Sequence, residues 1–464
     1  VYEGRNGYPI TFHAEDGVTI TGSGSSTSGA AFYFEDNKYI VIDGFDVIGT
    51  AFKGIFITYS DHITITNNYI AEAGEPVVGY EHEGINLKDV TYSLIEGNVV
   101  CNNTSTGILL RDRSNNNVVS NNISYGNYNA VGEPTSAAGI QVNDSDYNTI
   151  IHNITYGNID SGINLYISIL GTGSKHNQVV GNLTYGNGDH GIDNNNSPYQ
   201  IIVGNTVHGN VTSGINLEGN STNATIENNI VMDNGLNPLV GKKGNIHIDS
   251  TSWSGIILDY NLYYRTGGTV QIAWNSTYYA TLAAFKAANP TLEVHGVEGN
   301  PLFMDPAPVA VLPLVVQEGD YHLQALSPAI DSADSSAPSM PTTDIEGNPR
   351  VDIPTVDPNT GGGMFDYYDR GAYERQITTI TKLYVTSITS TYGNTVDLTA
   401  TLEPALENME ISFKLNGVAA CSDTTNASGL ATCKATLLTN VGTYEDEEGI
   451  VANFAGNSEY DPSS

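Results

Sequence analysis

Short apolar runs separated by glycine and asparagine recur along the first 300 residues. A phrase of the form Gly-Ile-x-apolar recurs at Gly54, Gly84, Gly107, Gly139, Gly162 and Gly214, with a weaker copy at Gly191. Successive copies lie 30, 23, 32, 23, 29 and 23 residues apart. Each copy is followed by an alternating strand that ends in asparagine, at Asn68, Asn98, Asn122, Asn153, Asn182, Asn205 and Asn229. A period of this length predicts a repeat architecture.

Two or three short strands in each repeat fit a coil that rises by one strand spacing, about 4.8 Å, per turn. Inward Ile, Val and Leu side chains would then stack on their equivalents in the next coil. The recurrent asparagines tolerate a left-handed backbone at a corner, and their amides can hydrogen-bond along the axis. A leucine-rich horseshoe would need a Leu-x-x-Leu-x-Leu period, which the chain lacks. We therefore predict an all-β fold in which residues 1–299 form a parallel β-helix.

The composition and the strand pattern of the sequence change twice after the repeats. The stretch TLAAFKAANP predicts a short α-helix, because Leu282, Phe285 and Ala288 fall on one face. Repeat arrays need covered ends, so the proline-rich segment 300–375 is interpreted as a cap over the last coil. Residues 376–464 contain about seven short, Thr-rich alternating strands, which predict a β-sandwich.

The net charge of the chain limits the classes of molecule that it can bind. The chain has 17 Lys and Arg against 51 Asp and Glu, a formal net charge of -34. Such a surface repels nucleic acid and anionic lipid, so we expect neither as a partner, and it also disfavours polyanionic sugars. No apolar run approaches the length of a membrane-spanning segment.

Three cysteines indicate the redox compartment. Cys421 and Cys433 lie twelve residues apart, in two strand-like runs that flank a turn-rich centre. A disulfide across a hairpin is the expected arrangement, with two unpaired buried thiols as the alternative. Cys101 is interpreted as a lone core residue. A disulfide would place the chain in an oxidising, extracellular environment.

The sequence resembles the right-handed β-helix proteins of bacterial and archaeal surfaces, a broad group that includes pectate-lyase-like enzymes. The segments DYHLQALSPAIDSAD, TDIEGNPR and DYYDRGAYE are similar to a module that ends many of these surface proteins. The tail resembles bacterial and archaeal immunoglobulin-like modules. These likenesses imply a fold more strongly than a function, because the fold hosts lyases, hydrolases, epimerases and inert scaffolds.

One local likeness implies chemistry. The phrase that ends in Lys88, followed one coil later by the phrase that ends in Arg111, is similar to the catalytic pair of the alginate lyase and chondroitinase B family. There, a Lys acts as base, an Arg on the next coil acts as acid, and acidic residues hold calcium. In this chain Asp89 and Asp112 follow where the family has Ser and His. The alternative is that both cations are solvated residues that end a strand and are neutralised by these two carboxylates.

Carboxylate clusters make Ca²⁺ a candidate ligand, although no cofactor is required by the pattern. The clusters are Glu72 with Glu75, Glu81 with Glu83, and Asp189 with Asp193, and we take Glu81 and Glu83 as the candidate ligands. None of the clusters has a defined ligand spacing. A pair of glycosidase carboxylates could also be drawn from them, but no two residues are singled out by the sequence.

Asparagine glycosylation signals are frequent, with twelve Asn-x-Ser/Thr acceptors. Several are by-products of strands that end in Asn, and Asn122, Asn153 and Asn182 are expected to point inward. Five acceptors lie in turn-like polar sequence and are the candidate glycosylation sites: Asn102, Asn220, Asn223, Asn275 and Asn426.

These patterns favour a non-catalytic extracellular or cell-surface protein with a structural or adhesive role. Its expected partners are a polysaccharide, neighbouring surface proteins or further copies of itself in a sheath, fibre or surface layer. The alternative is a polysaccharide lyase, or another carbohydrate-active enzyme, that acts on a uronate-containing polymer.

Overall fold

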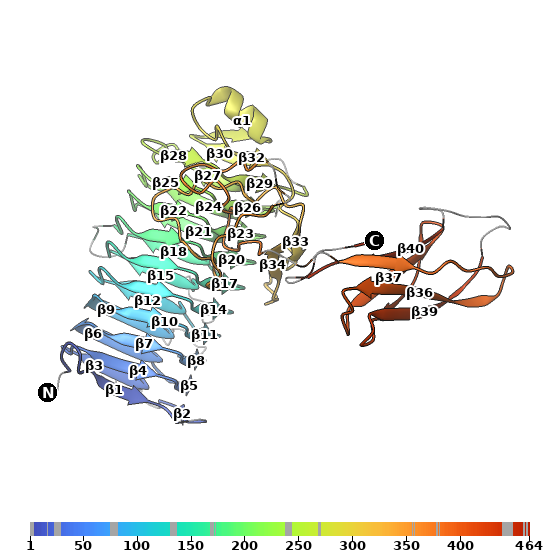
Figure 1. Cartoon of the computed structure of the whole chain (residues 1–464). Helices are drawn as coiled ribbons and strands as arrows, with labels where there is room; N and C mark the ends of the chain where they lie inside the picture. The colour runs from blue at the N-terminus through green and yellow to red at the C-terminus, as the bar shows by residue number, and fades with distance from the viewer. Residues whose placement is uncertain are drawn as a thin grey trace. The chain divides into compact units, whose positions relative to one another are not determined.

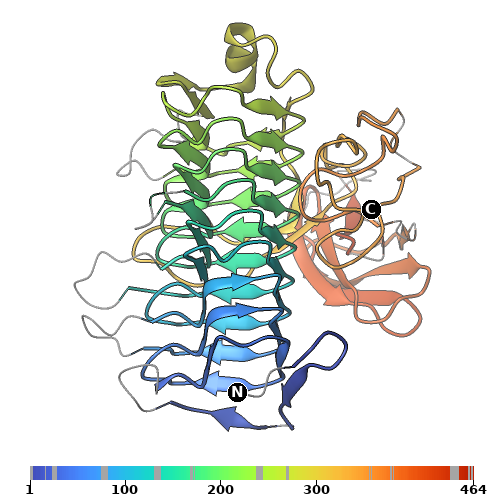
Figure 2. The ribbon, with the colours of Figure 1, turned by 90° about the vertical axis from the view of Figure 1, so that its left-hand side faces the viewer.

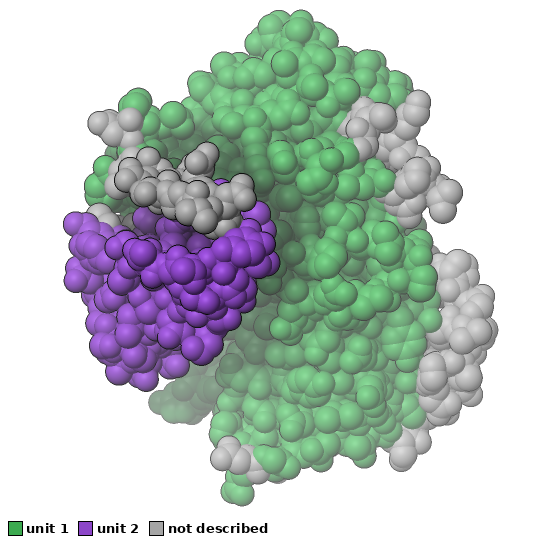
Figure 3. Space-filling view, turned by 90° about the vertical axis from the view of Figure 1, so that its right-hand side faces the viewer, with its two compact units in different colours: residues 1–374 green, residues 375–464 purple. Residues whose placement is uncertain are grey.

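The computed structural model describes residues 4–15, 17–22, 29–74, 82–129, 137–167, 171, 173–236, 244–267, 271–354, 356, 358–376, 379, 381–438, 449–457, 460 and 463–464. The chain divides into two compact units, Val1–Glu374 and Arg375–Ser464 (Figure 3). The first unit is a parallel β-helix with three long sheets, so the predicted fold class is confirmed (Figure 1). No helix in the described part of the chain is long and apolar enough to cross a membrane.

Each coil of the first unit contributes one strand to each of the three sheets (Figure 2). The first sheet contains β1 (Ile10–His13), β4 (Ile40–Asp43), β7 (Thr64–Thr66), β10 (Leu94–Glu96), β13 (Val118–Ser120), β16 (Thr149–Ile151), β19 (Gln178–Val180), β22 (Ile201–Val203), β25 (Thr225–Glu227) and β28 (Ile257–Asp259). The second sheet contains β2 (Thr19–Ile20), β5 (Asp46–Ile48), β8 (Tyr69–Ala71), β11 (Val99–Cys101), β14 (Ile123–Tyr125), β17 (Ile154–Tyr156), β20 (Leu183–Tyr185), β23 (Thr206–His208), β26 (Ile230–Met232), β29 (Leu262–Tyr264) and β32 (Val297–Glu298).

The third sheet is built from the Gly-Ile phrases. It contains β3 (Phe32–Glu35), β6 (Ile55–Asp61), β9 (Ile85–Thr91), β12 (Ile108–Arg111), β15 (Ile140–Asn143), β18 (Ile163–Tyr166), β21 (His190–Asn195), β24 (Ser213–Glu218), β27 (Gly244–Ile248), β30 (Ile272–Trp274) and the antiparallel β31 (Thr277–Tyr279). The isoleucine and the fourth residue of each phrase point into the core, where Ile85, Ile108 and Ile140 are register partners and fully buried. The third and fifth residues therefore face outward.

Two long asparagine ladders run along the corners of the β-helix, as expected from the repeats, and a shorter one links Asn117, Asn148 and Asn177. In the first ladder, each Nδ2 donates to the Oδ1 of the next coil, from Asn68 through Asn98, Asn122, Asn153, Asn182, Asn205 and Asn229 to Asn261. Its last amide donates to the buried carboxylate of Glu293 at 2.7 Å. The second ladder runs from Asn103 to Gln271, whose Nε2 donates to Glu298 at 2.9 Å.

The left-handed residue at the corner is not the ladder asparagine itself. Where the sequence suggested that the recurrent Asn would take that conformation, the residue just before it does, as at Asn67 and Asn121, with φ of 56° at each. The ladder residue keeps an ordinary backbone, because its amide must point inward to reach both neighbouring coils.

An aromatic ridge lies on the corner between the third and first sheets. It consists of Tyr39, His62, Tyr92, Tyr147, His176 and Tyr199, all with φ between 52° and 64°. Their rings stack between coils: Tyr39 on His62 on Tyr92, and Tyr147 on His176 on Tyr199. A left-handed backbone costs a bulky residue roughly 1–2 kcal/mol, and a stacked ring pair returns about 0.5–1.5 kcal/mol.

The short helix α1 (Leu282–Ala288) begins after the N-cap Thr281, as the sequence predicts. Leu282 and Phe285 are buried, whereas Ala288 at the last turn is exposed. Phe285 packs edge-on against Trp274 and Tyr279, so α1 joins the core at the final coils.

The segment 300–374 does not lie over the last coil alone, in contrast to the interpretation from sequence. It contains β33 (Phe303–Asp305) and β34 (Asp320–Leu323) and packs along the outer face of the second sheet. Tyr156 stacks on Tyr185, and Tyr185 contacts Tyr321 of this segment at 4.8 Å between ring centres. The physical reason is that β17, β20, β26 and β29 carry apolar side chains on their outer face, so this face must also be covered.

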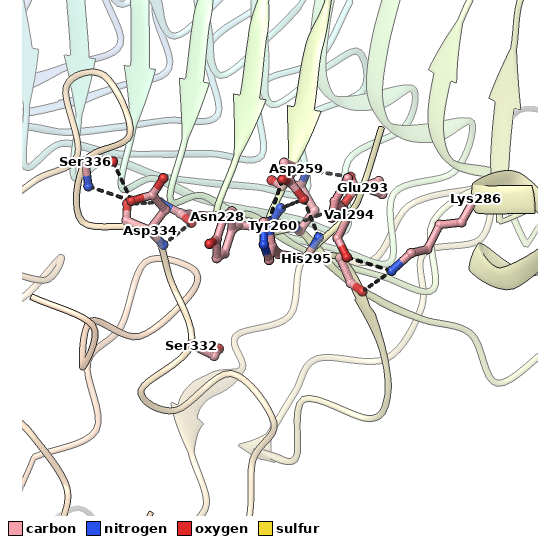
Figure 4. A network of polar contacts seen from close by, with 12 residues as sticks. Asn228, Asp259, Tyr260, Lys286, Glu293, Val294, His295, Ser332, Asp334 and Ser336 are labelled. Atoms are coloured by element: carbon pink, nitrogen blue, oxygen red, sulfur yellow. Dashed lines mark hydrogen bonds and ion pairs between the residues drawn. The ribbon is translucent and has the colours of Figure 1, made fainter. Parts of the chain in front are cut away.

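Polar contacts fasten the same segment to the last coils. The fully buried guanidinium of Arg370 donates to the carbonyl oxygens of Ser332, Asn261 and His295. Asn228 exchanges two hydrogen bonds with the backbone of Asp334 (Figure 4). The sequence motif around Arg370 is therefore structural.

The second unit has six strands in its described residues, arranged as two antiparallel three-stranded sheets. One contains β35 (Lys382–Val385), β36 (Thr395–Glu403) and β39 (Leu430–Thr436), and the other contains β38 (Val418–Thr424), β37 (Glu410–Leu415) and β40 (Ile450–Phe454). The arrangement is consistent with the predicted sandwich. Cys421 in β38 is disulfide-bonded to Cys433 in β39, so the bond joins the two sheets rather than the two strands of one hairpin. Cys101 is a buried free thiol.

Candidate functional site

Lys88 and Arg111 lie side by side on the outer face of the third sheet. They are register partners in β9 and β12, and their side chains are 32% and 30% exposed. Arg111 Nη1 lies 3.4 Å from Asp112 Oδ2, and Lys88 Nζ lies 4.0 Å from the same oxygen. The two cations therefore share one carboxylate.

The sequence suggested that Asp89 would neutralise Lys88, but the structure gives Asp89 a different partner. Its carboxylate accepts a hydrogen bond from Arg113 Nη2 at 2.7 Å, one coil further along. The Lys88 ammonium instead lies over the ring of Tyr59 at 5.8 Å from the ring centre. Asp112 also follows Arg111 where the related lyases have a histidine, so the chemistry that the resemblance implies lacks one of its usual partners.

Of the two candidate calcium ligands, Glu81 and Glu83, the structure describes only Glu83. Glu81 lies outside the described residues. Glu83 forms a buried ion pair with Lys53. Burial alone would raise the pKa of Glu83, but the Lys53 ammonium outweighs it and lowers that pKa below its usual value. Among the residues that the structure describes, no three His, Cys, Asp or Glu side chains are placed to hold a metal ion.

An open polar groove runs along the outer face of the third sheet, next to Arg111. Its volume of about 830 Å³ lies within the usual range for ligand sites. Arg111 is its only described cation, beside four carboxyl groups. The lining residues are Glu83, Ser105, Leu109, Arg111, Asn129, Gln141, Asn143, Ile159, Asp160, Asn164, Tyr166, Asp189, Asp193 and Asn195.

The floor of the groove consists of the outward residues of successive Gly-Ile phrases. Gln141 accepts a hydrogen bond from Thr106 Oγ1 at 3.1 Å. Asn164 is only 6% exposed, and its Oδ1 accepts no hydrogen bond from the described protein. The same is true of Asn143 Oδ1. Both oxygens are buried, so the groove is lined by amide side chains whose remaining polar atoms can exchange hydrogen bonds with a hydroxylated ligand.

Asp193 lies at one end of this floor, in β21, and is 8% exposed. Burial raises its pKa well above the ordinary value, and the charges of Glu218, Asp189 and Asp160 act in the same direction. The Asn216 amide opposes this shift by donating to Asp193 Oδ1 at 2.6 Å. A raised pKa favours the protonated form of a carboxyl group, which is the form that can donate a proton.

Two histidines lie in the same region of the third sheet: His190 is in the strand of Asp193, and His247 occupies the equivalent position two coils further on. His247 Nδ1 is 2.5 Å from Asn216 Oδ1, and because that oxygen can only accept, Nδ1 must carry the proton. His190 Nδ1 is 2.5 Å from Ser213 Oγ, and its Nε2 is 3.4 Å from Asp189. The sequence places Asp189 and Asp193 among the carboxylate clusters that could bind Ca²⁺. The neighbours Asn216 and His247 could have been found from the sequence, because they occupy the same outward position of the repeat as Asp193.

All five candidate glycosylation sites have exposed side chains, in turns or loops: Asn102, Asn220, Asn223, Asn275 and Asn426. In contrast, Asn122, Asn153 and Asn182 are fully buried in the first ladder, as expected. A glycan does not fit at a ladder position. Glycan attachment at the exposed sites stays a prediction.

Residues 8–168 and 136–285 match the family described as the right handed beta helix region. These segments cover more than half of the chain. The chain belongs to this family. No curated protein matches it.

Several solved structures are similar at low identity. They include pectate lyase Pel9A, at 15% identity and TM-score 0.45 over 79% of this chain and 86% of that chain. They also include a double mutant of the periplasmic alginate epimerase AlgG, at 17% and 0.40 over 48% and 50%. The A-module of mannuronan C-5 epimerase AlgE4 from Azotobacter vinelandii matches at 16% and 0.42 over 56% and 71%. This chain thus spans about half the length of the alginate epimerase.

Proposed function

We propose that this chain is an extracellular protein that binds a neutral polysaccharide along the groove on the third sheet. The observation that carries the proposal is the set of amide side chains on the floor of the groove: Gln141 and Asn164 are register partners in β15 and β18, and Asn143 follows in β15. Sugar hydroxyls can both donate hydrogen bonds to amide side chains and accept hydrogen bonds from them. The sheet repeats its outward side chains at one strand spacing, about 4.8 Å, which suits a ligand that is itself a repeating polymer.

Electrostatics selects a neutral glycan over a uronate polymer. The groove offers Arg111 against Glu83, Asp160, Asp189 and Asp193, and Glu83 is already paired with Lys53. The whole chain carries a net charge of -34. A polyanion would therefore meet repulsion both in the groove and at long range.

An extracellular location and an adhesive role are parts of the same proposal. The disulfide between Cys421 and Cys433 supports an oxidising compartment. Five exposed Asn-x-Ser/Thr acceptors are compatible with a glycosylated surface protein.

Binding is tested with the full chain against immobilised neutral glucan, xylan, mannan and galactan, with alginate as the polyanion. We expect one or more neutral polymers to bind and alginate not to bind. Asn164→Ala should weaken binding about tenfold, the loss that corresponds to 1.4 kcal/mol for one hydrogen bond. The matched control is Tyr33→Ala, which alters the same outward column outside the groove. Binding to alginate alone would contradict the proposal.

A second candidate function is hydrolysis of the bound glycan, favoured by the position of Asp193 in the groove and by the burial that raises its pKa. This acid could donate its proton to a glycosidic oxygen while a neighbouring carboxylate accepts a proton from the attacking water. Asp193→Asn should then abolish the release of reducing ends and leave binding within about threefold of the parent. Binding by the parent without any release of reducing ends would leave the adhesive role alone.

A further inference from the structure

The aromatic ridge has one missing rung. Tyr92, Asn116 and Tyr147 occupy equivalent positions, each two residues before register partners of the first sheet, Leu94, Val118 and Thr149. Asn116 thus takes the place of a ring between two stacks of three. Its side chain is exposed, and its φ of 58° matches that of its neighbours in the ridge.

Each stack fixes the orientation of its last ring. Tyr147 is nearly parallel to His176, with 4° between the ring planes, and Tyr92 is inclined by 27° to His62. One face of each tyrosine is covered by its histidine. The other face looks along the axis toward the coil of Asn116. Both tyrosines remain largely exposed, at 61% and 57%.

The distance between the two free faces follows from the register. Two strand spacings separate Tyr92 from Tyr147, or about 9.6 Å. A ring placed midway would lie about 4.8 Å from each tyrosine, within the range of about 4.5–7 Å at which aromatic faces make contact. The spacing between the two tyrosines therefore matches one six-membered ring alongside the exposed Asn116 side chain, and we call this gap, lined by Tyr92, Asn116 and Tyr147, the slot.

The rim of the slot is polar. Asn115 Oδ1 accepts a hydrogen bond from the backbone N–H of Asp146 at 2.7 Å, and Asp146 Oδ1 accepts from the backbone N–H of Lys175 at 2.7 Å. Together with the amide of Asn116, these groups place hydrogen-bonding atoms beside two apolar faces. A pyranose ring has the same distribution, with C–H groups on its faces and hydroxyls around its edge.

We propose that the slot formed by Tyr92, Asn116 and Tyr147 binds one sugar ring of a neutral glycan between the two tyrosines. The choice of a glycan rests on the proposed function, but the slot is separate from the groove. Asp146 at the rim disfavours an anionic sugar. Six aromatic residues hold a left-handed backbone along this ridge, where asparagine would be less strained, so the rings are maintained at a cost in backbone strain.

The test measures binding of neutral gluco-, xylo-, manno- and galacto-oligosaccharides to the full chain by calorimetry and by tyrosine fluorescence. Tyr92→Ala and Tyr147→Ala should each weaken binding at least tenfold. Asn116→Tyr should abolish binding at the slot by completing the stack, while the melting temperature stays at or above that of the parent. Tyr39→Ala removes a ring from the far end of the same ridge and should change affinity less than twofold.

The groove variant Asn164→Ala separates this inference from the proposed function. If Asn164→Ala loses binding and Asn116→Tyr does not, the groove binds the glycan and the slot is refuted. If Asn116→Tyr alone loses binding, the slot stands and the groove fails. Loss of self-association in Asn116→Tyr, measured by sedimentation and without any glycan binding, would make an aromatic side chain of a second copy the occupant and overturn the inference. A parent that binds no neutral oligosaccharide would overturn it as well.

Discussion

Replacement of Asn122 by alanine would break the first asparagine ladder near its middle. The Asn122 side chain accepts from the backbone N–H and the Nδ2 of Asn98, at 3.0 and 2.9 Å. Its own Nδ2 donates to Ile95 O, Ser120 O and Asn153 Oδ1, each at 2.9 Å. The site is fully buried, so water cannot take over these bonds without opening the coil.

The expected loss follows from the groups that are left without partners. The backbone N–H of Asn98 loses its acceptor, and the amide of Asn98 and the carbonyl of Ile95 each lose one of their bonds. A buried polar group without a partner costs about 1–3 kcal/mol, so we expect a destabilisation of about 3–5 kcal/mol in all. Asn121→Gly is the matched control, because Asn121 is exposed and its φ of 56° suits glycine.

Urea unfolding of the full chain, followed by circular dichroism, measures the difference. Hydrogen exchange should show the loss first at the coils that contain Asn98 and Asn153. A stability within 0.5 kcal/mol of the Asn121→Gly control would refute the idea that the amide ladder stabilises the β-helix.

Further predictions concern the ends and the second unit. Burial raises the pKa of Glu293 to about 7 from 4.5, so stability should fall by about 3 kcal/mol as pH rises between these values, and Glu293→Gln should flatten the decline measured by chemical unfolding. Arg370→Met should expose 300–374 to limited proteolysis, because three buried carbonyls lose their donor and about 3 kcal/mol or more is lost. Alkylation under denaturing, non-reducing conditions should label Cys101 alone; three labelled thiols would contradict the disulfide. The full chain should show two separate melting transitions by calorimetry, and a fragment of residues 375–464 should melt at the temperature of one of them.

The core of the fold could be predicted because the repeat encodes it redundantly. Each Gly-Ile phrase specifies the same inward pair, and each terminal Asn repeats the same ladder contact. The position of 300–374 could not be predicted, since it depends on outward side chains such as Tyr156 and Tyr185, whose partners lie more than 100 residues away in sequence.

In the candidate site too, some features could be predicted from the sequence and others could not. The register of Lys88 and Arg111 followed from their equal offsets after glycine. The partner of Asp89 did not, because Arg113 reaches it across a coil and no spacing indicates that contact. The groove was harder still to foresee. Its floor uses positions where the repeat imposes no residue type, so Asn164 and Asp193 stand out only when the outward columns are assembled in space.

The asparagine ladders give the solenoid a direction and a stop. Every rung passes one hydrogen-bond donor forward, so an added coil would have to supply an acceptor to the coil before it and a donor to the coil after it. Glu293 and Glu298 can accept but have no N–H to pass on when ionised. Each of these two carboxylates therefore ends one of the long ladders. A further coil of the same kind could not extend the amide array beyond Glu293 or Glu298.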